Sequence, residues 1–248
     1  MKNTSFAAVG VATVLSVAGA GFAAGPALAL NGAGSASTTS ANAAVALPEC
    51  GGFTQVEAAA LGYNTVVRGG FNNAIIGTSG PDWVMAGGGA DTITTLGGDD
   101  FVCGEAGDDV IDSGADNDDV FGNEDNDTID LGSGLFDFAE GNDGDDEING
   151  EGGPDSIVGD SAPFPLNTDE GEDTLSGGKA SDDLFGGGLH DRLEGGDGAD
   201  DLFGDDGEDT LRGGRGVDDL TGGADFDDGN GGAGVDTTCD VEAPVNCP

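Results

Sequence analysis

The sequence predicts an all-β fold, a right-handed parallel β-solenoid in which tandem nonapeptides form two facing sheets. Three observations predict it. Asp recurs at intervals of nine residues, a large aliphatic residue follows two positions after almost every Asp, and glycines fill the first half of most units. The half that contains Asp is short and β-prone, and its aliphatic side chain is expected to face inward. The glycine half can turn the chain, so two nonapeptides close one coil.

The N-terminal segment has the pattern of an export signal. Residues 1–29 contain one early Lys, then a run of small and apolar residues, then Pro26-Ala27-Leu28-Ala29. This pattern predicts a signal peptide cleaved after Ala29, with an uncleaved N-terminal anchor as the alternative. Residues 30–58 are small, polar and without a period, which is typical of a flexible linker. We therefore expect a secreted, extracellular protein with no membrane span after cleavage.

The repeat array is predicted over residues 59–238. Residues 59–76 keep the period with Asn64 and Asn73 in place of Asp, as expected for degenerate capping units that cover the core. Residues 159–170 contain two prolines where a unit should stand, so this stretch is expected to loop out while the array continues. Residues 239–248 are expected to form a C-terminal tail. The recurring Asp residues are Asp82, Asp91, Asp100, Asp109, Asp118, Asp127, Asp137, Asp146, Asp155, Asp173, Asp182, Asp191, Asp200, Asp209, Asp218, Asp227 and Asp236.

Composition limits the kind of partner that this chain can bind. The chain has 49 Asp and Glu residues against 6 Lys and Arg residues, a net charge of −43. Such an excess argues against nucleic acid and against anionic membrane surfaces, since both are themselves polyanions. It favours multivalent cations. Zinc is a poor candidate, because His190 is the one histidine and no Cys-x-x-Cys motif occurs.

The four cysteines predict two disulfides in an exported chain. Cys239 and Cys247 are close in sequence and could form a disulfide that constrains the C-terminal tail, and Cys50 could then bond to Cys103. Free thiols are the alternative.

The unit G-G-x-G-x-D-x-U-x, in which U is a large aliphatic residue, is matched in full by residues 195–203 and 213–221. It resembles the RTX, or hemolysin-type, calcium-binding nonapeptide repeat over roughly residues 59–238. The resemblance implies a β-roll with Ca²⁺ in its turns, each ion held by the motif Asp and by carbonyls of the glycine region. The metal ligands that it implies are Asp82, Asp91, Asp100, Asp109, Asp118, Asp127, Asp146, Asp155, Asp173, Asp182, Asp200, Asp209 and Asp218.

Some units depart from the family pattern. The fourth position, normally Gly, is Asp116, Asp125, Ala180, Leu189 or Asp225 in five units, and a non-Gly residue with a positive φ is strained. The sites at Leu189 and Asp225 are therefore the weakest of these matches, and the unit of Asp137 is ten residues long. Asp137, Asp191 and Asp227 are accordingly left out of the implied ligand set.

Calcium also answers a physical difficulty of the predicted fold. One aliphatic side chain per unit makes a thin core, and stacked carboxylates repel each other. Carboxylates and turn carbonyls are the hard oxygen ligands that Ca²⁺ prefers, so shared ions would convert the repulsion into attraction. Folding and calcium binding are then expected to be one equilibrium.

No enzyme is expected from this sequence. Residues 30–58 are too few for a catalytic domain, and no nucleophile–base pair accompanies His190. We expect an exported calcium-binding protein, structural or associated with the cell surface, with cell-wall or surface components as further partners. The alternative is a calcium-dependent adhesin or ligand-binding module that uses an outer face of the roll.

The aromatic residues mark one such face. Phe185 and Phe203 are two units apart and should stack, and Trp83, Phe101 and Phe121 also occupy outward positions. The sequence leaves open whether these side chains form an exposed strip or pack under the linker.

Overall fold

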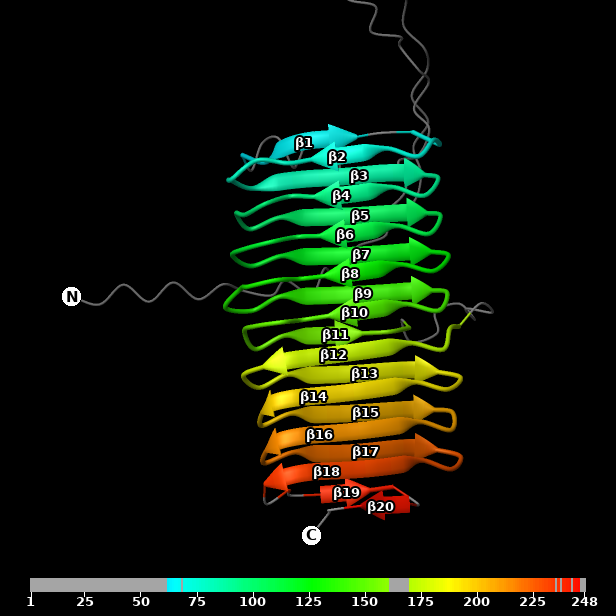
Figure 1. Ribbon diagram of the computed structural model, residues 1–248. Coiled ribbons are helices and arrows are strands. Elements are labelled where there is room, and N and C mark those ends of the chain that lie inside the picture. The colour runs from blue at the N-terminus through cyan, green and yellow to red at the C-terminus, as the bar shows by residue number, and fades with distance from the viewer. Residues whose placement is uncertain are drawn as a thin grey trace, which may run out of the picture. The chain divides into compact units, whose positions relative to one another are not determined.

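The computed structural model describes residues 62–67, 69–160, 170–234, 236, 238–241 and 243–245. These residues form a parallel β-solenoid with two ten-stranded sheets and no helix (Figure 1). The chain alternates between the sheets, so that odd-numbered strands form sheet A and even-numbered strands form sheet B. The predicted all-β β-roll is therefore confirmed. No helix long and apolar enough to cross a membrane occurs in this described part of the chain.

The strands are short, between three and seven residues, and in the longer ones, such as β14 and β16, glycines of the next unit lie inside the strand. Sheet A contains β1 (Asn64–Val67), β3 (Asp82–Gly88), β5 (Phe101–Ala106), β7 (Asp119–Glu124), β9 (Phe138–Asp143), β11 (Ser156–Val158), β13 (Asp183–Gly188), β15 (Asp201–Asp206), β17 (Asp219–Ala224) and β19 (Thr238–Asp240). Sheet B contains β2 (Ala74–Ile76), β4 (Thr92–Thr94), β6 (Val110–Asp112), β8 (Thr128–Asp130), β10 (Glu147–Asn149), β12 (Thr174–Lys179), β14 (Arg192–Gly198), β16 (Thr210–Gly216), β18 (Asp228–Gly234) and β20 (Ala243–Val245).

The pairing register follows the nonapeptide period. Paired residues lie 18 apart in most coils, as Asp183 and Asp201 do, because two units make one coil. The separation is 19 around the ten-residue unit, where Val120 pairs with Ala139. Across the predicted loop the separation becomes 27, between Ser156 and Asp183. One nonapeptide's length of chain is thus left out of the register. Residues 161–169 lie outside the described part, so the loop expected over residues 159–170 stays a prediction.

The core is a single column of aliphatic side chains between the two sheets. Val84, Ile93 and their counterparts up to Leu220 are buried in one continuous cluster. The column begins in the degenerate units, where Ile75 is buried and Val66 packs against it. Those units have therefore kept the fold without the Asp.

Truncating one core residue should show how much this column contributes. Leu202 is fully buried, so we expect Leu202→Ala to destabilise the calcium-loaded protein by about 2–5 kcal/mol in urea unfolding. Leu135 is 82% exposed, so Leu135→Ala should change the stability by less than about 0.5 kcal/mol. Equal effects of the two variants would contradict the assigned core.

The C-terminal end departs from the predicted pattern. Thr238 stands two residues after Asp236, where the repeat places a core residue, but Leu220 pairs with Cys239, so the register is displaced by one residue. Gly229 stands where the repeat places an aliphatic residue, and Val241 lies close to it, since a Cβ added to Gly229 would lie 2.6 Å from Val241 Cγ2. β20 also pairs with β18 inside the segment 239–248 that the sequence assigns to a tail. Strand pairing uses the backbone alone and so continues where the side-chain motif has ended.

The aromatic residues of the described strands all belong to sheet A. Trp83 and Phe101 are buried and form a cluster with Met85 and Cys103, so the exposed-strip alternative is wrong for these two residues. Cys103 is disulfide-bonded, but Cys50, its predicted partner, lies outside the described residues, as does Cys247. In the C-terminal half, the rings of Phe185 and Phe203 stack as predicted, with centroids 5.0 Å apart.

Candidate metal centre

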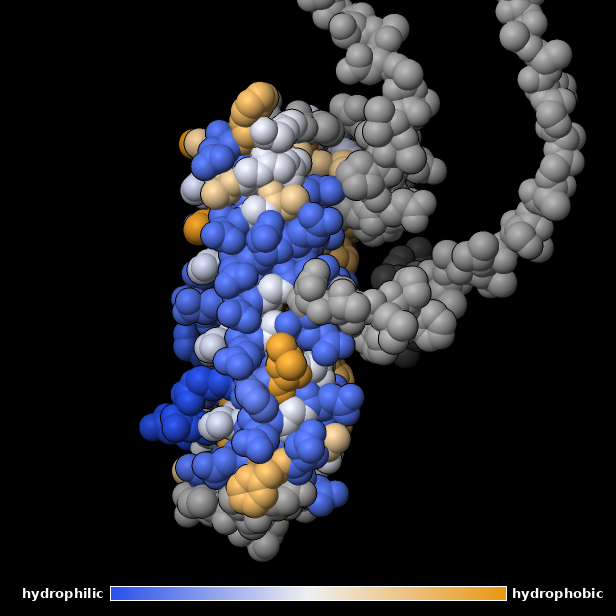
Figure 2. Space-filling view, turned by 90° about the vertical axis from the view of Figure 1, so that its right-hand side faces the viewer, coloured by the Kyte–Doolittle hydropathy of each residue, from blue (hydrophilic) through white to orange (hydrophobic). Residues whose placement is uncertain are grey.

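The recurring Asp residues form two Asp ladders, one along each edge of the solenoid. The first ladder lies in the turns that enter sheet A and the second in the turns that enter sheet B. The first ladder contains Asp82, Asp100, Asp118, Asp137, Asp155, Asp182, Asp200, Asp218 and Asp236, and the second contains Asp91, Asp109, Asp127, Asp146, Asp173, Asp191, Asp209 and Asp227. Figure 2 looks onto the second edge, where the surface is hydrophilic apart from isolated apolar side chains.

In most of the ladder Asp residues, which we call rungs, the carboxylate oxygen Oδ1 accepts a hydrogen bond that links two successive coils. The backbone N–H of Asp82 donates to Oδ1 of Asp100 at 2.7 Å, and the N–H of Asp100 donates to Oδ1 of Asp118 at 2.9 Å. The same bond recurs along both ladders, up to the bond from Asp218 to Asp236. Asp fits this position because its short side chain reaches the next backbone within one strand spacing.

The other carboxylate oxygen, Oδ2, is buried without a hydrogen-bond partner in most rungs. Buried polar atoms are normally paired, so a repeated exception calls for a ligand. The residues concerned are Asp91, Asp100, Asp109, Asp118, Asp127, Asp137, Asp146, Asp155, Asp173, Asp182, Asp191, Asp200 and Asp209. Asp82 differs, because its Oδ2 accepts hydrogen bonds from the backbone and hydroxyl of Thr78.

Glycine makes room for this oxygen. A Cβ added to Gly195, the first residue of its unit, would lie 2.5 Å from Oδ2 of Asp200 and 2.8 Å from the carbonyl oxygen of Gly213. The first glycine of most other units lies against the Asp of its own unit in the same way. In the units that begin with Gly, the unpaired oxygen therefore faces a turn in which backbone carbonyls are accessible because the side chain is missing.

Burial raises the pKa values of the ladder carboxyl groups. Every ladder Asp is at most 4% exposed. Desolvation raises the pKa of Asp100 and Asp209 to about 6 and that of Asp118 to about 8, with neighbouring rungs adding to the rise and the backbone hydrogen bond opposing it. The largest rise is at Asp173, to about 9, where Asp160, Asp146 and Asp191 are the nearby charges. Keeping these buried carboxyl groups ionised therefore destabilises the folded chain, and a bound cation would remove that destabilisation.

Side chains alone do not complete a metal site. Among the described residues, no group of three or more His, Cys, Asp or Glu side chains is arranged to hold a metal ion. Ca²⁺ takes six to eight oxygen ligands and accepts backbone carbonyls readily. The arrangement therefore suits an ion bound by one or two carboxylates and by the carbonyls of the glycine turns.

All thirteen ligands implied by the sequence lie in the two ladders. The structure also places Asp137, Asp191 and Asp227 there, with the same backbone hydrogen bonds as their neighbours. The non-Gly residues at the fourth position do not disturb the turns. Their φ values lie between 70° at Leu189 and 78° at Ala180, in the left-handed region that the missing Gly would occupy.

Asp160 is a buried carboxylate that the repeat pattern does not predict. It lies in a turn of the second edge, just before residues 161–169, and its Oδ2 accepts hydrogen bonds from the N–H groups of Gly171 and Gly188 at 3.2 and 3.3 Å. Its Oδ1 is buried without a partner. Asp160 stands outside the nine-residue period, so the spacing of the repeats gives no signal for it.

The fold and the ladders define a class: a parallel β-solenoid with regularly spaced, buried carboxylates in its turns. A family model for the RTX calcium-binding nonapeptide repeat matches residues 68–102, 96–129, 131–162, 166–193, 194–229 and 203–237. These matches span more than half of the chain, so the chain belongs to the RTX calcium-binding repeat family. No curated protein matches the chain. It is a calcium-binding repeat protein, and repeats of this family are typically structural rather than catalytic.

Proposed function

We propose that several calcium ions bind along both edges of the solenoid, and that the array folds as they bind. The observation that carries the proposal is the row of buried, unpaired Oδ2 atoms facing glycine turns. Each ion would be held by ladder carboxylates and by carbonyls of the glycine region, and it would supply positive charge between stacked anions. Along both ladders, the implied ligands are the thirteen Asp residues named from the sequence together with Asp137, Asp191 and Asp227. On the second edge, Asp160 would add a further carboxylate beside Asp173.

A matched pair of variants tests the ligand assignment. Asp200 is buried in the first ladder, whereas the adjacent Asp201 is exposed. Asp200→Asn removes a ladder charge and should weaken calcium binding at the sites that share it about tenfold in isothermal titration. Asp201→Asn removes the same charge one residue away and should leave the titration unchanged. If the two variants titrate alike, the ladder is not the ligand set.

Calcium affinity should fall as the pH falls. The carboxyl pKa values of Asp118, Asp146 and Asp173 are raised to about 8, 7 and 9 in the folded chain, above the ordinary value of 3.8. Protons therefore favour the ion-free folded chain below these values, and they compete with calcium for the same oxygens. Between pH 9 and 6, we expect the affinity to drop by up to about tenfold per pH unit for each proton displaced.

Isothermal titration in buffers of different ionisation enthalpy would count the protons released on calcium binding. An affinity that stays constant between pH 9 and 6, with no proton release, would show that calcium displaces no protons from the ladder carboxyl groups and would contradict this prediction.

The proposal also includes where the protein is located. The signal-like residues 1–29 and the predicted disulfides support an exported protein, structural or associated with the cell surface. An adhesin or ligand-binding module is the second candidate, favoured by the different side chains on the two outer faces. Retention of the protein on cell-wall fractions with calcium, and its release by chelator, would support a surface role. Absence of retention under both conditions would favour a free extracellular protein.

A further inference from the structure

Four side chains on the outer face of sheet A form a second apolar cluster, separate from the core column. Trp83 and Met85 lie in β3, and Phe101 and Cys103 lie in β5. They alternate with core residues along their strands, so they point away from the core. All four are nevertheless at most 7% exposed. We call these four residues the outer patch.

Neighbouring coils alone do not bury an outward side chain in this fold. Phe203 occupies the same position of its unit as Met85, three residues after the ladder Asp. It lies between Phe185 and Thr221 in sheet A, and it is still partly exposed, whereas Met85 is 4% exposed. Ile76, an outward residue of sheet B at the same end of the solenoid, is 75% exposed. A further layer of chain therefore covers the outer patch.

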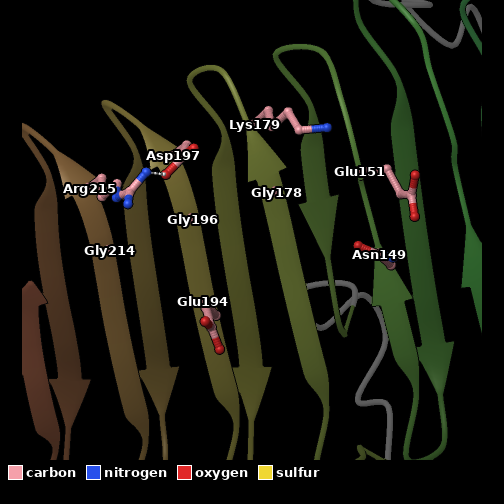
Figure 3. Close-up of a pocket in the computed structure, with 9 residues that line it drawn as sticks. All are labelled: Asn149, Glu151, Gly178, Lys179, Glu194, Gly196, Asp197, Gly214 and Arg215. Atoms are coloured by element: carbon pink, nitrogen blue, oxygen red, sulfur yellow. Dashed lines mark hydrogen bonds and ion pairs between the residues drawn. The ribbon is translucent and has the colours of Figure 1, made fainter.

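Sheet B has a different outer face. The basic residues of the described chain all lie in its strands β12, β14 and β16, and they are Lys179, Arg192, Arg212 and Arg215. Figure 3 shows the Arg215 guanidinium directed at Asp197, with which it pairs at 3.4 Å. Both side chains are more than half exposed, so this part of sheet B is open to solvent. The covering layer is thus a feature of the first coils of sheet A.

Cys103 identifies the covering segment, because it is disulfide-bonded. Cys239 is too far away to be its partner. β5 and β19 are seven positions apart in the order of sheet A, which corresponds to about 34 Å, and the Cα atoms of a disulfide lie within about 7 Å of each other. Cys247 follows Val245 of the last strand by two residues, which span about 7 Å at most, so it is too far away as well. Cys50 is the cysteine that remains.

The chain between Cys50 and β1 is long enough for this bond. The distance from β1 to β5 is two strand spacings, about 10 Å, and a dozen extended residues can span about 40 Å. The compact unit that contains the solenoid begins at Ala46. Residues 46–61 include Leu47, Phe53 and Val56, which can supply apolar contacts to the outer patch.

The first coils also contain the fewest groups that need a cation. Asn64 and Asn73 stand where later units have Asp, so no carboxylate is buried there. Oδ2 of Asp82 accepts hydrogen bonds from the backbone N–H and the hydroxyl of Thr78. A second apolar layer is therefore added to the part of the solenoid in which charge burial is smallest.

We infer that Cys50 is bonded to Cys103 and that residues 46–61 cover the outer patch, which gives a disulfide-locked N-terminal nucleus that stays folded without calcium. A small disulfide such as oxidised glutathione would accept the two electrons and two protons of the two thiols by thiol–disulfide exchange. Thiols stay reduced in the cytosol, so the nucleus would be completed after export. The calcium-bound coils would then add to it. The calcium independence of the nucleus rests on the proposed coupling of folding to calcium, whereas the disulfide assignment does not.

Trp83 is the one tryptophan of the chain, so its fluorescence reports on the outer patch alone. In excess chelator, oxidised protein should lose most of its far-UV β-signal, while the Trp83 emission stays at short wavelength and protected from acrylamide. Reduction with a phosphine in the same buffer should shift the emission to longer wavelength and abolish the protection. Mass spectrometry of unreduced peptides should find Cys50 joined to Cys103.

Two double variants are matched for this test. Cys50→Ser/Cys103→Ser should behave in chelator like the reduced wild type, whereas Cys239→Ser/Cys247→Ser should behave like the oxidised wild type. Far-UV circular dichroism with calcium shows that each variant folds, and the reduced wild type replaces a variant that does not.

Three results would overturn the inference: Cys103 joined to another cysteine, an exposed Trp83 in oxidised protein with chelator, or a protected Trp83 in the variant that lacks Cys50 and Cys103. If all proteins keep their full β-signal in chelator, the coupling of folding to calcium fails and the calcium-independent nucleus fails with it. The peptide map still decides the disulfide assignment in that case.

Discussion

In excess chelator at pH 8, the protein is expected to lose most of its β-structure, and calcium in the millimolar range should restore it. The ladders bury carboxylates whose pKa values are raised to between about 6 and about 9, so at pH 8 most of them are charged without a counter-ion. A core of one aliphatic side chain per unit is too thin to offset that charge burial. Far-UV circular dichroism during a calcium titration measures the transition.

Magnesium is the control for this experiment. Mg²⁺ demands a small octahedral site and keeps its water, so it should restore little structure at the same concentration. Equal β-content with chelator and with calcium would show that the solenoid is stable without ions, and the proposed coupling of folding to binding would then fail.

Adding one methyl group beneath a ladder carboxylate should damage both stability and calcium binding. In Gly195→Ala, the new Cβ would lie 2.5 Å from Oδ2 of Asp200 and 2.8 Å from the carbonyl oxygen of Gly213. The carboxylate and the neighbouring coil must therefore move, which should cost about 1–3 kcal/mol of stability in the calcium-loaded protein. Urea unfolding at fixed calcium measures the first effect, and calcium titration measures the second.

Gly80→Ala makes the same chemical change in open space, because no atom lies within 4 Å of an added Cβ there. It should leave stability and calcium affinity close to those of the wild type. If Gly195→Ala has the same stability and calcium affinity as Gly80→Ala, the carboxylate of Asp200 does not require glycine at position 195.

The period of the sequence predicted most of the fold. Two positions repeat in phase, one acidic and one aliphatic, and in a solenoid this is enough to define the strand, the core side and the pairing partner. Hence the core column, the stack of Phe185 on Phe203 and the continuation of the strand pairing into the units around Asn64 and Asn73 could be inferred. Asn73 even keeps the ladder bond, because its N–H donates to Oδ1 of Asp91.

The features that the sequence did not predict depend on backbone conformation, which the identity of the side chain does not reveal. The second position of the unit is left-handed as well as the fourth, and it tolerates Leu96 and Glu105 at φ values of 78° and 81°. Neighbouring coils hold these turns by backbone hydrogen bonds, so residues that disfavour this conformation are accepted. The same holds for Asp160, whose burial follows from the coils around it and not from the repeat.

The interruption between β11 and β12 has a consequence for the two outer faces. Each nonapeptide takes the chain to the opposite sheet. Whether the number of units is odd or even therefore decides in which sheet every later strand lies. By leaving out one unit, the protein keeps Phe185 and Phe203 in the same sheet as Phe101, and keeps Lys179 and Arg215 in the other. Had that unit formed a strand, every later coil would show its faces exchanged. An array of this kind can gain or lose units in pairs and keep its surfaces, whereas a single added unit would mix the aromatic and the basic face.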